Sequence, residues 1–177
     1  MAKGLPHINI SVKTPLKDIL KLAGDCNKCG HCCKYSSGYL VGDDAKKIAK
    51  FLKINEKELK EKFLEQGEKF NTKLHRPKII KKDNKPYGEC VFYDNKEMCT
   101  IHEVKPLHCK VGGCNEHGEA LHIWFTLNYF VNKNDPESIR QWAAHLKTHP
   151  TIPGGELEEL VPDKKTLNKI LSFKILR

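Results

Sequence analysis

The sequence predicts a small α+β fold that is mostly helical, with a short β-hairpin and long loops that carry cysteines. Apolar residues recur at helical spacing in several segments, and two short strand-like stretches flank one polar turn. All eight cysteines fall in two tight groups between residues 26 and 114. Short regular elements combined with loops of dense thiols are typical of metal-binding domains, so we expect a small metal-binding domain.

Residues 1–23 are expected to form an N-terminal arm. Within it, His7–Val12 fits a short strand and Pro15–Leu22 a short helix, which Gly24 would end. We place the eight-cysteine metal- or cluster-binding domain at residues 24–115 and a C-terminal helical cover at residues 116–177. The first cysteine group would form a loop, in which Gly30 lets the backbone turn tightly between thiolates.

Two helices are predicted after the first cysteine group. Asp43 is a candidate N-cap of the first, and Asn55 with Glu58 resembles a capping box at the second. Apolar residues at helical spacing extend the second helix to Phe70. The segment 71–85 is predicted to be a basic connector between the two cysteine groups.

The second cysteine group begins with the predicted hairpin. Its strands would be Gly88–Tyr93 and Met98–Ile101, with Cys90 and Cys99 on the two arms. In the cover, residues 120–131 fit either a helix or a strand. Asp135-Pro136 marks a clear helix start, and a last helix is expected around Leu167.

Charge and hydropathy limit the classes of protein. The net charge is +9, and the basic residues are mostly lysines that alternate with acids. The longest apolar-aromatic run, residues 123–131, is shorter than the roughly 20 residues that span a bilayer, and no signal peptide is visible. We therefore expect a cytoplasmic protein with no membrane association. Because cytoplasmic thiols stay reduced, clustered cysteines favour metal ligation over a disulfide framework.

The cysteines fit two four-thiolate sites. Their spacing in the first group is C-x₂-C-x₂-C with an adjacent fourth cysteine, which suits a [4Fe–4S] cluster better than a pair of zinc ions. Zinc remains the alternative, since paired C-x₂-C elements also form Zn–Cys₄ sites. In thiol titration of the metal-loaded protein, we expect almost no cysteine to react until the metal is removed. All eight cysteines are therefore expected to be ligands: Cys26, Cys29, Cys32, Cys33, Cys90, Cys99, Cys109 and Cys114.

The expected division of these ligands follows from side-chain direction. Cys26, Cys29 and Cys32 would bind one [4Fe–4S] cluster with a fourth ligand from the second group. Cys33 would serve a second cluster with the remaining cysteines, because adjacent side chains in an extended chain point apart.

Other polar residues near the cysteines are given structural roles. His31, His102 and His108 could ligate metal, but eight thiols suffice, so we expect them to support ligands or face solvent. The densest lysine run comprises Lys78, Lys81, Lys82 and Lys85. It contains no aromatic residue for base stacking, so we expect weak or no nucleic-acid binding.

At this point the motifs resemble a known family. Cys26-x₂-Cys29-Gly30-x-Cys32-Cys33, Cys90-Val91-Phe92, Cys99-Thr100-Ile101-His102-Glu103 and Lys105-Pro106 with Cys109-Lys110 are similar to the YkgJ-type cysteine-cluster family, a zinc- or iron-chelating CxxCxxCC domain. The resemblance covers about residues 24–114 and implies a metal- or cluster-binding domain. His102 stands where tyrosine is usual in that pattern, and Lys105 and Lys110 stand where arginine is usual.

Three functions are compatible with this sequence. The first is an iron–sulfur protein that transfers electrons or supports a partner enzyme, so a protein partner is expected. The second is a zinc-binding interaction module. The third is an iron–sulfur protein-modifying enzyme, because a related cysteine pattern occurs in lysine methylases that act on flagellin. We rank the enzyme last, since no nucleotide- or cofactor-binding motif and no acid–base pair is recognisable.

Overall fold

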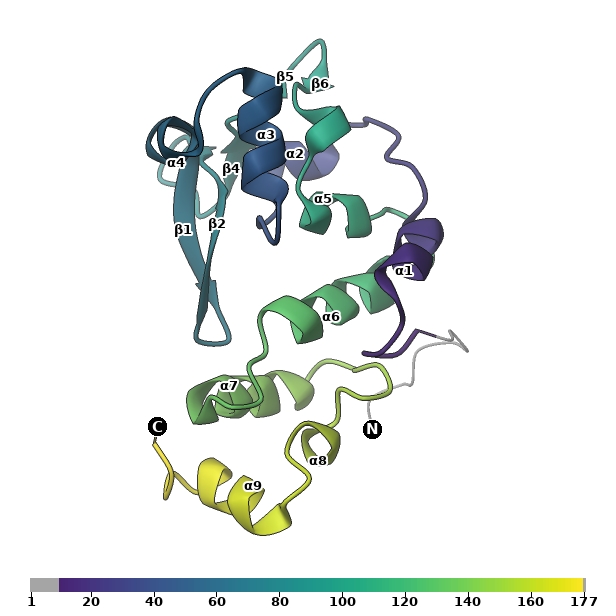
Figure 1. Cartoon of the computed structure of the whole chain (residues 1–177), viewed down its shortest axis with the longest axis vertical. Coiled ribbons are helices and arrows are strands. Elements are labelled where there is room, and N and C mark those ends of the chain that lie inside the picture. The colour runs from purple at the N-terminus through teal and green to yellow at the C-terminus, as the bar shows by residue number, and fades with distance from the viewer. Residues whose placement is uncertain (1–9, 177) are drawn as a thin grey trace. The chain divides into compact units, whose positions relative to one another are not determined.

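A computed structural model describes residues 10–176 of the chain (Figure 1). The α+β class is confirmed, and within these residues the strands pair only two by two: β1 with β2, β3 with β4, and β5 with β6. The elements in chain order are α1 Leu16–Ala23, α2 His31–Tyr35, α3 Asp44–Leu52, α4 Glu56–Phe63, β1 Leu64–Lys69, β2 Thr72–Pro77, β3 Ile79–Lys81, β4 Gly88–Cys90, β5 Tyr93–Asp94, β6 Met98–Cys99, the 3₁₀ helix η1 His102–Val104, α5 Leu107–Val111, α6 Gly118–Tyr129, α7 Pro136–Leu146, α8 Leu157–Leu160 and α9 Lys164–Leu171.

The chain divides into two compact units. Among residues 10–176, unit 2 comprises residues 25–67 and 74–113, and unit 1 comprises residues 10–24, 68–73 and 114–176. The expected arm and the expected cover therefore belong to the same unit. Seven of the eight cysteines lie in unit 2, and Cys114 lies in unit 1.

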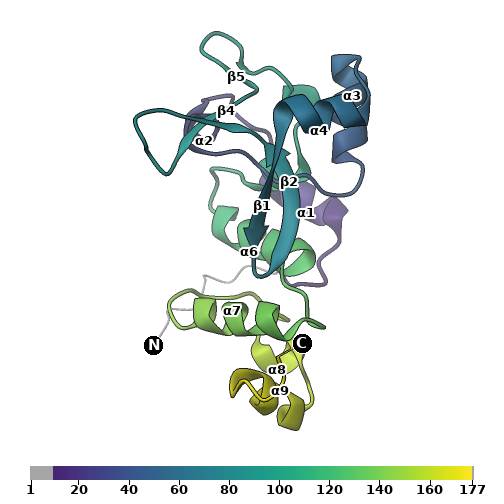
Figure 2. The ribbon, with the colours of Figure 1, turned by 90° about the vertical axis from the view of Figure 1, so that its left-hand side faces the viewer.

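Unit 2 is built on a small apolar core. Helices α3 and α4 pack against each other, as Figure 2 shows, and the side-chain oxygen of Asn55 caps α4 by accepting from the backbone N–H of Glu58 (2.8 Å). This confirms the predicted cap. Two cysteines of β4 and β6 pack against the edge of the core, whose buried members are Leu40, Ile48, Ala49, Leu59, Leu64, Phe92 and Ile101.

The strands of unit 2 differ from the prediction. Helix α4 ends at Phe63, and the next residues form β1 instead of continuing a helix to Phe70. The predicted connector contains strands β2 and β3, and β4 pairs with β3, where Ile79 faces Cys90. The hairpin of β5 and β6 is real but shorter, so Cys90 lies outside it. Lysine-rich segments can pair as strands here because the hydrogen bonds between strands join backbone groups and do not require particular side chains.

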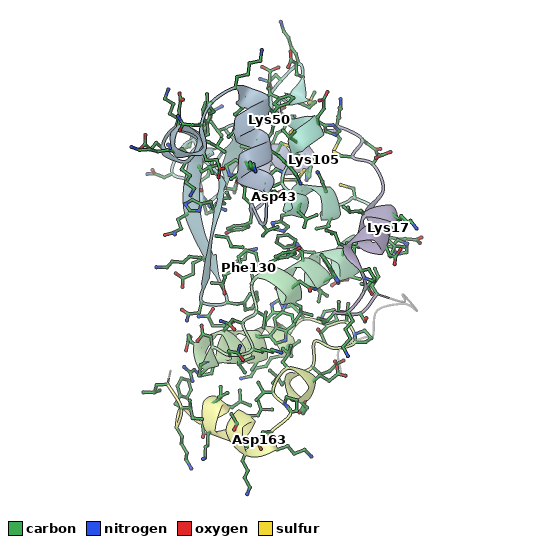
Figure 3. All side chains as sticks on the ribbon, viewed as in Figure 1. Lys17, Asp43, Lys50, Lys105, Phe130 and Asp163 are labelled. Atoms are coloured by element: carbon green, nitrogen blue, oxygen red, sulfur yellow. The ribbon has the colours of Figure 1, made fainter. Side chains whose placement is uncertain are left out.

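Two tryptophans anchor unit 1. The indole of Trp124 on α6 donates to the carbonyl of Thr14 (3.0 Å), and the indole of Trp142 on α7 donates to that of Gly155 (2.8 Å). The segment 120–131, whose sequence fitted either a helix or a strand, lies mostly in helix α6. Asp135 caps α7 as predicted, and Asp163, labelled in Figure 3, caps α9.

The arm of unit 1 has one of its two predicted elements. Helix α1 is present and ends at Gly24, which has a positive φ of 64°. The predicted strand falls partly on residues 7–9, outside the described residues, and residues 10–12 form no strand. Val12 instead donates a backbone hydrogen bond to Pro153 (2.9 Å). From residue 10 to residue 176, no helix has the length and apolar character needed to traverse a bilayer.

Candidate metal centre

The short helix α2 carries two of the candidate ligands, Cys32 and Cys33. The expected loop is therefore confined to residues 24–30, and the two cysteines are helical. Gly30 precedes the helix in the left-handed conformation (φ 72°), and a Cβ there would lie 2.9 Å from the sulfur of Met98. Glycine is needed at this turn for both its backbone angle and the close approach of β6, whose next residue is Cys99.

Three thiols in unit 2 share hydrogen bonds. Cys33 is bonded to both Cys32 and Cys99, which lowers the pKa of Cys32 to about 6 and that of Cys99 to about 7. Both interactions favour the protonated form of Cys33, so its own pKa is raised. The nearby ammonium of Lys105, labelled in Figure 3, also lowers the pKa of Cys32 and Cys99. The arrangement favours the thiolate forms of Cys32 and Cys99, and the thiolate is the form in which cysteine binds metals.

The contact between Cys32 and Cys33 corrects one premise of the ligand division. Adjacent side chains point apart in an extended chain, but these residues lie on a helix, where neighbours are separated by about 100°. Their sulfurs can therefore reach one another. The division of ligands between two sites stays a prediction.

Two more thiols, each partly buried, lie in the same neighbourhood. Burial raises the pKa of Cys90 to about 11 and that of Cys109 to about 12, and both interact electrostatically with Cys32 and Cys99. Gly38 packs directly on Cys109, because a Cβ at Gly38 would clash with the Cys109 sulfur.

The structure thus brings together the thiols of α2, β4, β6 and α5. We call this group the thiol cluster; its members are Cys32, Cys33, Cys90, Cys99 and Cys109.

The remaining three cysteines differ in their surroundings. Cys26 and Cys29 are exposed in the loop before α2, and Cys114 is exposed in unit 1. All eight are free thiols. Across residues 10–176, no three histidine, cysteine or acidic side chains stand in a geometry that holds a metal ion.

The three histidines beside the cysteines have distinct partners. The Nδ1 of His108 accepts from the backbone N–H of Tyr39 (3.1 Å), and the ring of His31 packs on Tyr35 at 5.1 Å between centroids. The ring of His102 donates to the backbone of Cys26, while its buried Nε2 has no hydrogen-bond partner. Burial, followed by the ammonium of Lys105, lowers the pKa of His102.

This state of His102 matches what a nitrogen ligand requires. Metal-bound imidazoles are neutral, and they use one nitrogen for the metal and the other for a hydrogen bond that fixes the ring. The sequence signal was the replacement of a usual tyrosine by histidine, but only burial of the unpartnered Nε2 distinguishes His102 from the other two. The donors of unit 2, thiols with one buried imidazole nitrogen, thus fit a soft or borderline metal such as iron or zinc.

Asp44 fixes the helix that carries Cys109. Its carboxylate is 6% exposed and accepts from the backbone N–H of Val41 (3.0 Å) and of Leu107 (2.9 Å), the first residue of α5. Asp43 occupies the expected cap position of α3, but its side chain makes no capping bond. Asp44, the residue after the predicted cap, therefore makes the side-chain hydrogen bonds. These bonds link the start of α3 to the start of α5, which are far apart in the sequence.

We predict that Asp44→Ala lowers the free energy of unfolding by about 2–4 kcal/mol, because it leaves two backbone donors unpaired. Asp43→Ala is the matched control and should change stability by about 0.5 kcal/mol or less, since its side chain is exposed. Urea unfolding of the metal-loaded protein, followed by circular dichroism, gives both values. Equal effects of the two substitutions would show that Asp44 has no such role.

A family model matches residues 25–126, and its description is "CxxCxxCC: Putative zinc- or iron-chelating domain". The match begins at the loop before α2, includes all eight cysteines, and extends into α6. No curated protein and no solved structure is significantly similar to the chain.

Proposed function

We propose, because this chain belongs to the CxxCxxCC family of zinc- or iron-chelating domains, that it is an iron–sulfur protein. In this proposal unit 2 binds two [4Fe–4S] clusters, and the protein transfers electrons to a protein partner or supports a partner enzyme. We place it in the cytoplasm, where its thiols stay reduced. Bound clusters would supply one-electron redox chemistry.

The thiol cluster is the observation that carries the proposal. A zinc ion in a structural site takes four ligands, whereas five thiols lie together here, with Cys26 and Cys29 in the same unit. Polynuclear clusters use such dense thiolate sets, with further cysteines serving a neighbouring cluster. The low pKa values of Cys32 and Cys99 support the deprotonated state that ligation requires.

The ligand set of unit 2 has room for a histidine. Its seven thiols and the Nε2 of His102 make eight donors, the number that two four-ligand clusters need. The expected eighth thiol, Cys114, belongs to unit 1. We therefore infer that His102 takes the ligand position that the sequence suggested for Cys114.

Two single substitutions test this assignment. We expect Cys114→Ser to keep the full iron content, and we expect His102→Ala to lose iron or change the spectrum of one cluster. His108→Ala is the matched control, because its Nδ1 already accepts from the backbone. Iron analysis and electron paramagnetic resonance of the reduced proteins check the result. Loss of iron in Cys114→Ser with none in His102→Ala would restore the eight-thiol assignment.

The function is tested on protein purified without oxygen. We expect broad visible absorption that bleaches on reduction with dithionite, together with a paramagnetic signal from the reduced clusters. Zinc binding is the alternative that the family description includes. A colourless protein with stoichiometric zinc would identify a zinc-binding interaction module and reject electron transfer.

A further inference from the structure

Unit 1 contains a cavity that none of the proposed metal ligands lines. Its volume is about 280 Å³, and it lies between the tip of the β1–β2 hairpin and helices α6 and α7. Ile123 and Thr126 of α6 and Trp142 of α7 form a floor in which each residue is at most 6% exposed. Lys69, which is exposed, and His122 also line the cavity.

The hairpin tip places an aromatic ring on one wall. Phe70 has a φ of 49°, a left-handed conformation that bulky residues rarely adopt. Its ring stands edge-on to Trp142 (5.4 Å between centroids) and to His145 (5.6 Å). The side chain of Asn71 donates to Asp135 (2.6 Å), which holds the tip against the start of α7. The wall is therefore fixed by contacts on both sides of the turn.

His145 forms a second flat wall. Its ring stacks on Trp142 at 5.0 Å between centroids and on His149 at 4.1 Å with an interplanar angle of 8°. Movement of this imidazole away from the cavity would break both ring contacts. The cavity thus presents fixed ring surfaces that suit a flat ligand.

The polar groups of the lining favour an anion. Lys69 brings a positive charge, and none of the lining residues is acidic. Its ammonium lies 5.9 Å from the ring centroid of Phe130, which is labelled in Figure 3. Burial is the largest cause that lowers the pKa of His122 and of His145; the charge of Lys69 adds to it for both, and His149 for His145. The lowered pKa favours the neutral imidazole, which carries one N–H.

We propose that this cavity binds a small aromatic carboxylate. Its ring would lie against Phe70 and His145 above the floor, and its carboxylate would face Lys69 and the imidazole N–H groups. A cavity of about 280 Å³ lies at the lower end of the sizes of small-molecule pockets, so its volume suits a ligand with one ring.

Benzoate is the probe that tests this proposal on the full-length, metal-loaded protein. We expect saturable shifts of the ring proton resonances of His122 and His145, with a dissociation constant of about 1 mM for so small a ligand. Benzyl alcohol lacks the charge, and acetate lacks the ring. We expect both to bind about tenfold more weakly or not at all.

Two lysine substitutions locate the charge contact. Lys69→Met should weaken benzoate binding about tenfold. Lys73→Met, on the same hairpin tip, is the matched control, because Lys73 pairs with Glu68 at 3.8 Å and does not line the cavity. It should leave the affinity unchanged.

Four results would overturn the proposal. Three of them need only the unmodified chain: no shift with benzoate, equal binding of benzyl alcohol, and equal competition by inorganic phosphate, which would indicate a site for a simple anion. The fourth is an equal loss of affinity in the two lysine variants. Iron content is read in the same samples, so failure of this site is distinct from failure of the iron–sulfur proposal.

Discussion

Removal of the metal from anaerobically purified protein should unfold unit 2 and leave unit 1 folded. The core of unit 2 is small, and Cys90 and Cys99 pack against it, so the ligands are part of the structure that they stabilise. In metal-dependent domains the free energy of metal binding is folding free energy, on the order of 10 kcal/mol for a structural site. The proposed ligands come from the loop before α2 and from α2, β4, β6, η1 and α5, and none of these segments completes a four-ligand site alone.

The two tryptophans make this prediction easy to measure. Both lie in unit 1, so indole fluorescence reports on that unit alone, while amide exchange at Ile48 and Leu59 reports on the core of unit 2. After chelation we expect the protection of those amides to be lost and the fluorescence maximum to remain. Unchanged protection of Ile48 and Leu59 in metal-free protein would show that unit 2 folds without metal.

Replacement of Cys33 and of Cys29 by serine should damage different clusters. In the expected division, Cys29 belongs with Cys26 and Cys32, and Cys33 belongs to the second cluster. Each variant should keep about four irons of about eight, and the double variant should keep none. The effect is large because a cluster that lacks one thiolate is labile.

Spectra of the two variants decide whether the division is correct. Because Cys33 also bonds Cys32 and Cys99, Cys33→Ala is included to separate loss of the ligand from the serine hydroxyl. We expect the signal that persists in Cys29→Ser to be the one lost from Cys33→Ser and Cys33→Ala. If all variants lose the same signal, the two sites do not divide as proposed.

Local signals in the sequence predicted most helices. The caps at Asn55 and Asp135 are recognisable because a side-chain oxygen there accepts a nearby backbone N–H, an interaction within three residues. The end of α4 at Phe63 and strand β3 were not predicted. The prediction at both places relied on the spacing of apolar residues and on lysine content, which are properties of the segment itself. Strand pairing, such as that of Ile79 with Cys90, depends on a partner outside the segment.

The sequence predicted which thiols are candidate ligands, but it did not predict how they are arranged in space. Cysteine spacing identified the candidates, but the contact of Cys33 with Cys99 joins residues from separate elements. The roles of Asp44 and Gly38 likewise depend on segments far away in sequence, Leu107 and Cys109. Such contacts depend on residues that are distant in the sequence, so only the fold shows which residues position the candidate ligands.

The iron, sulfide and zinc content of anaerobically purified protein tests the central claim most directly. Two [4Fe–4S] clusters predict about eight irons and about eight acid-labile sulfides per chain, with little zinc. About four irons would contradict the two-cluster assignment. One or two zinc ions without sulfide would contradict the iron–sulfur function itself.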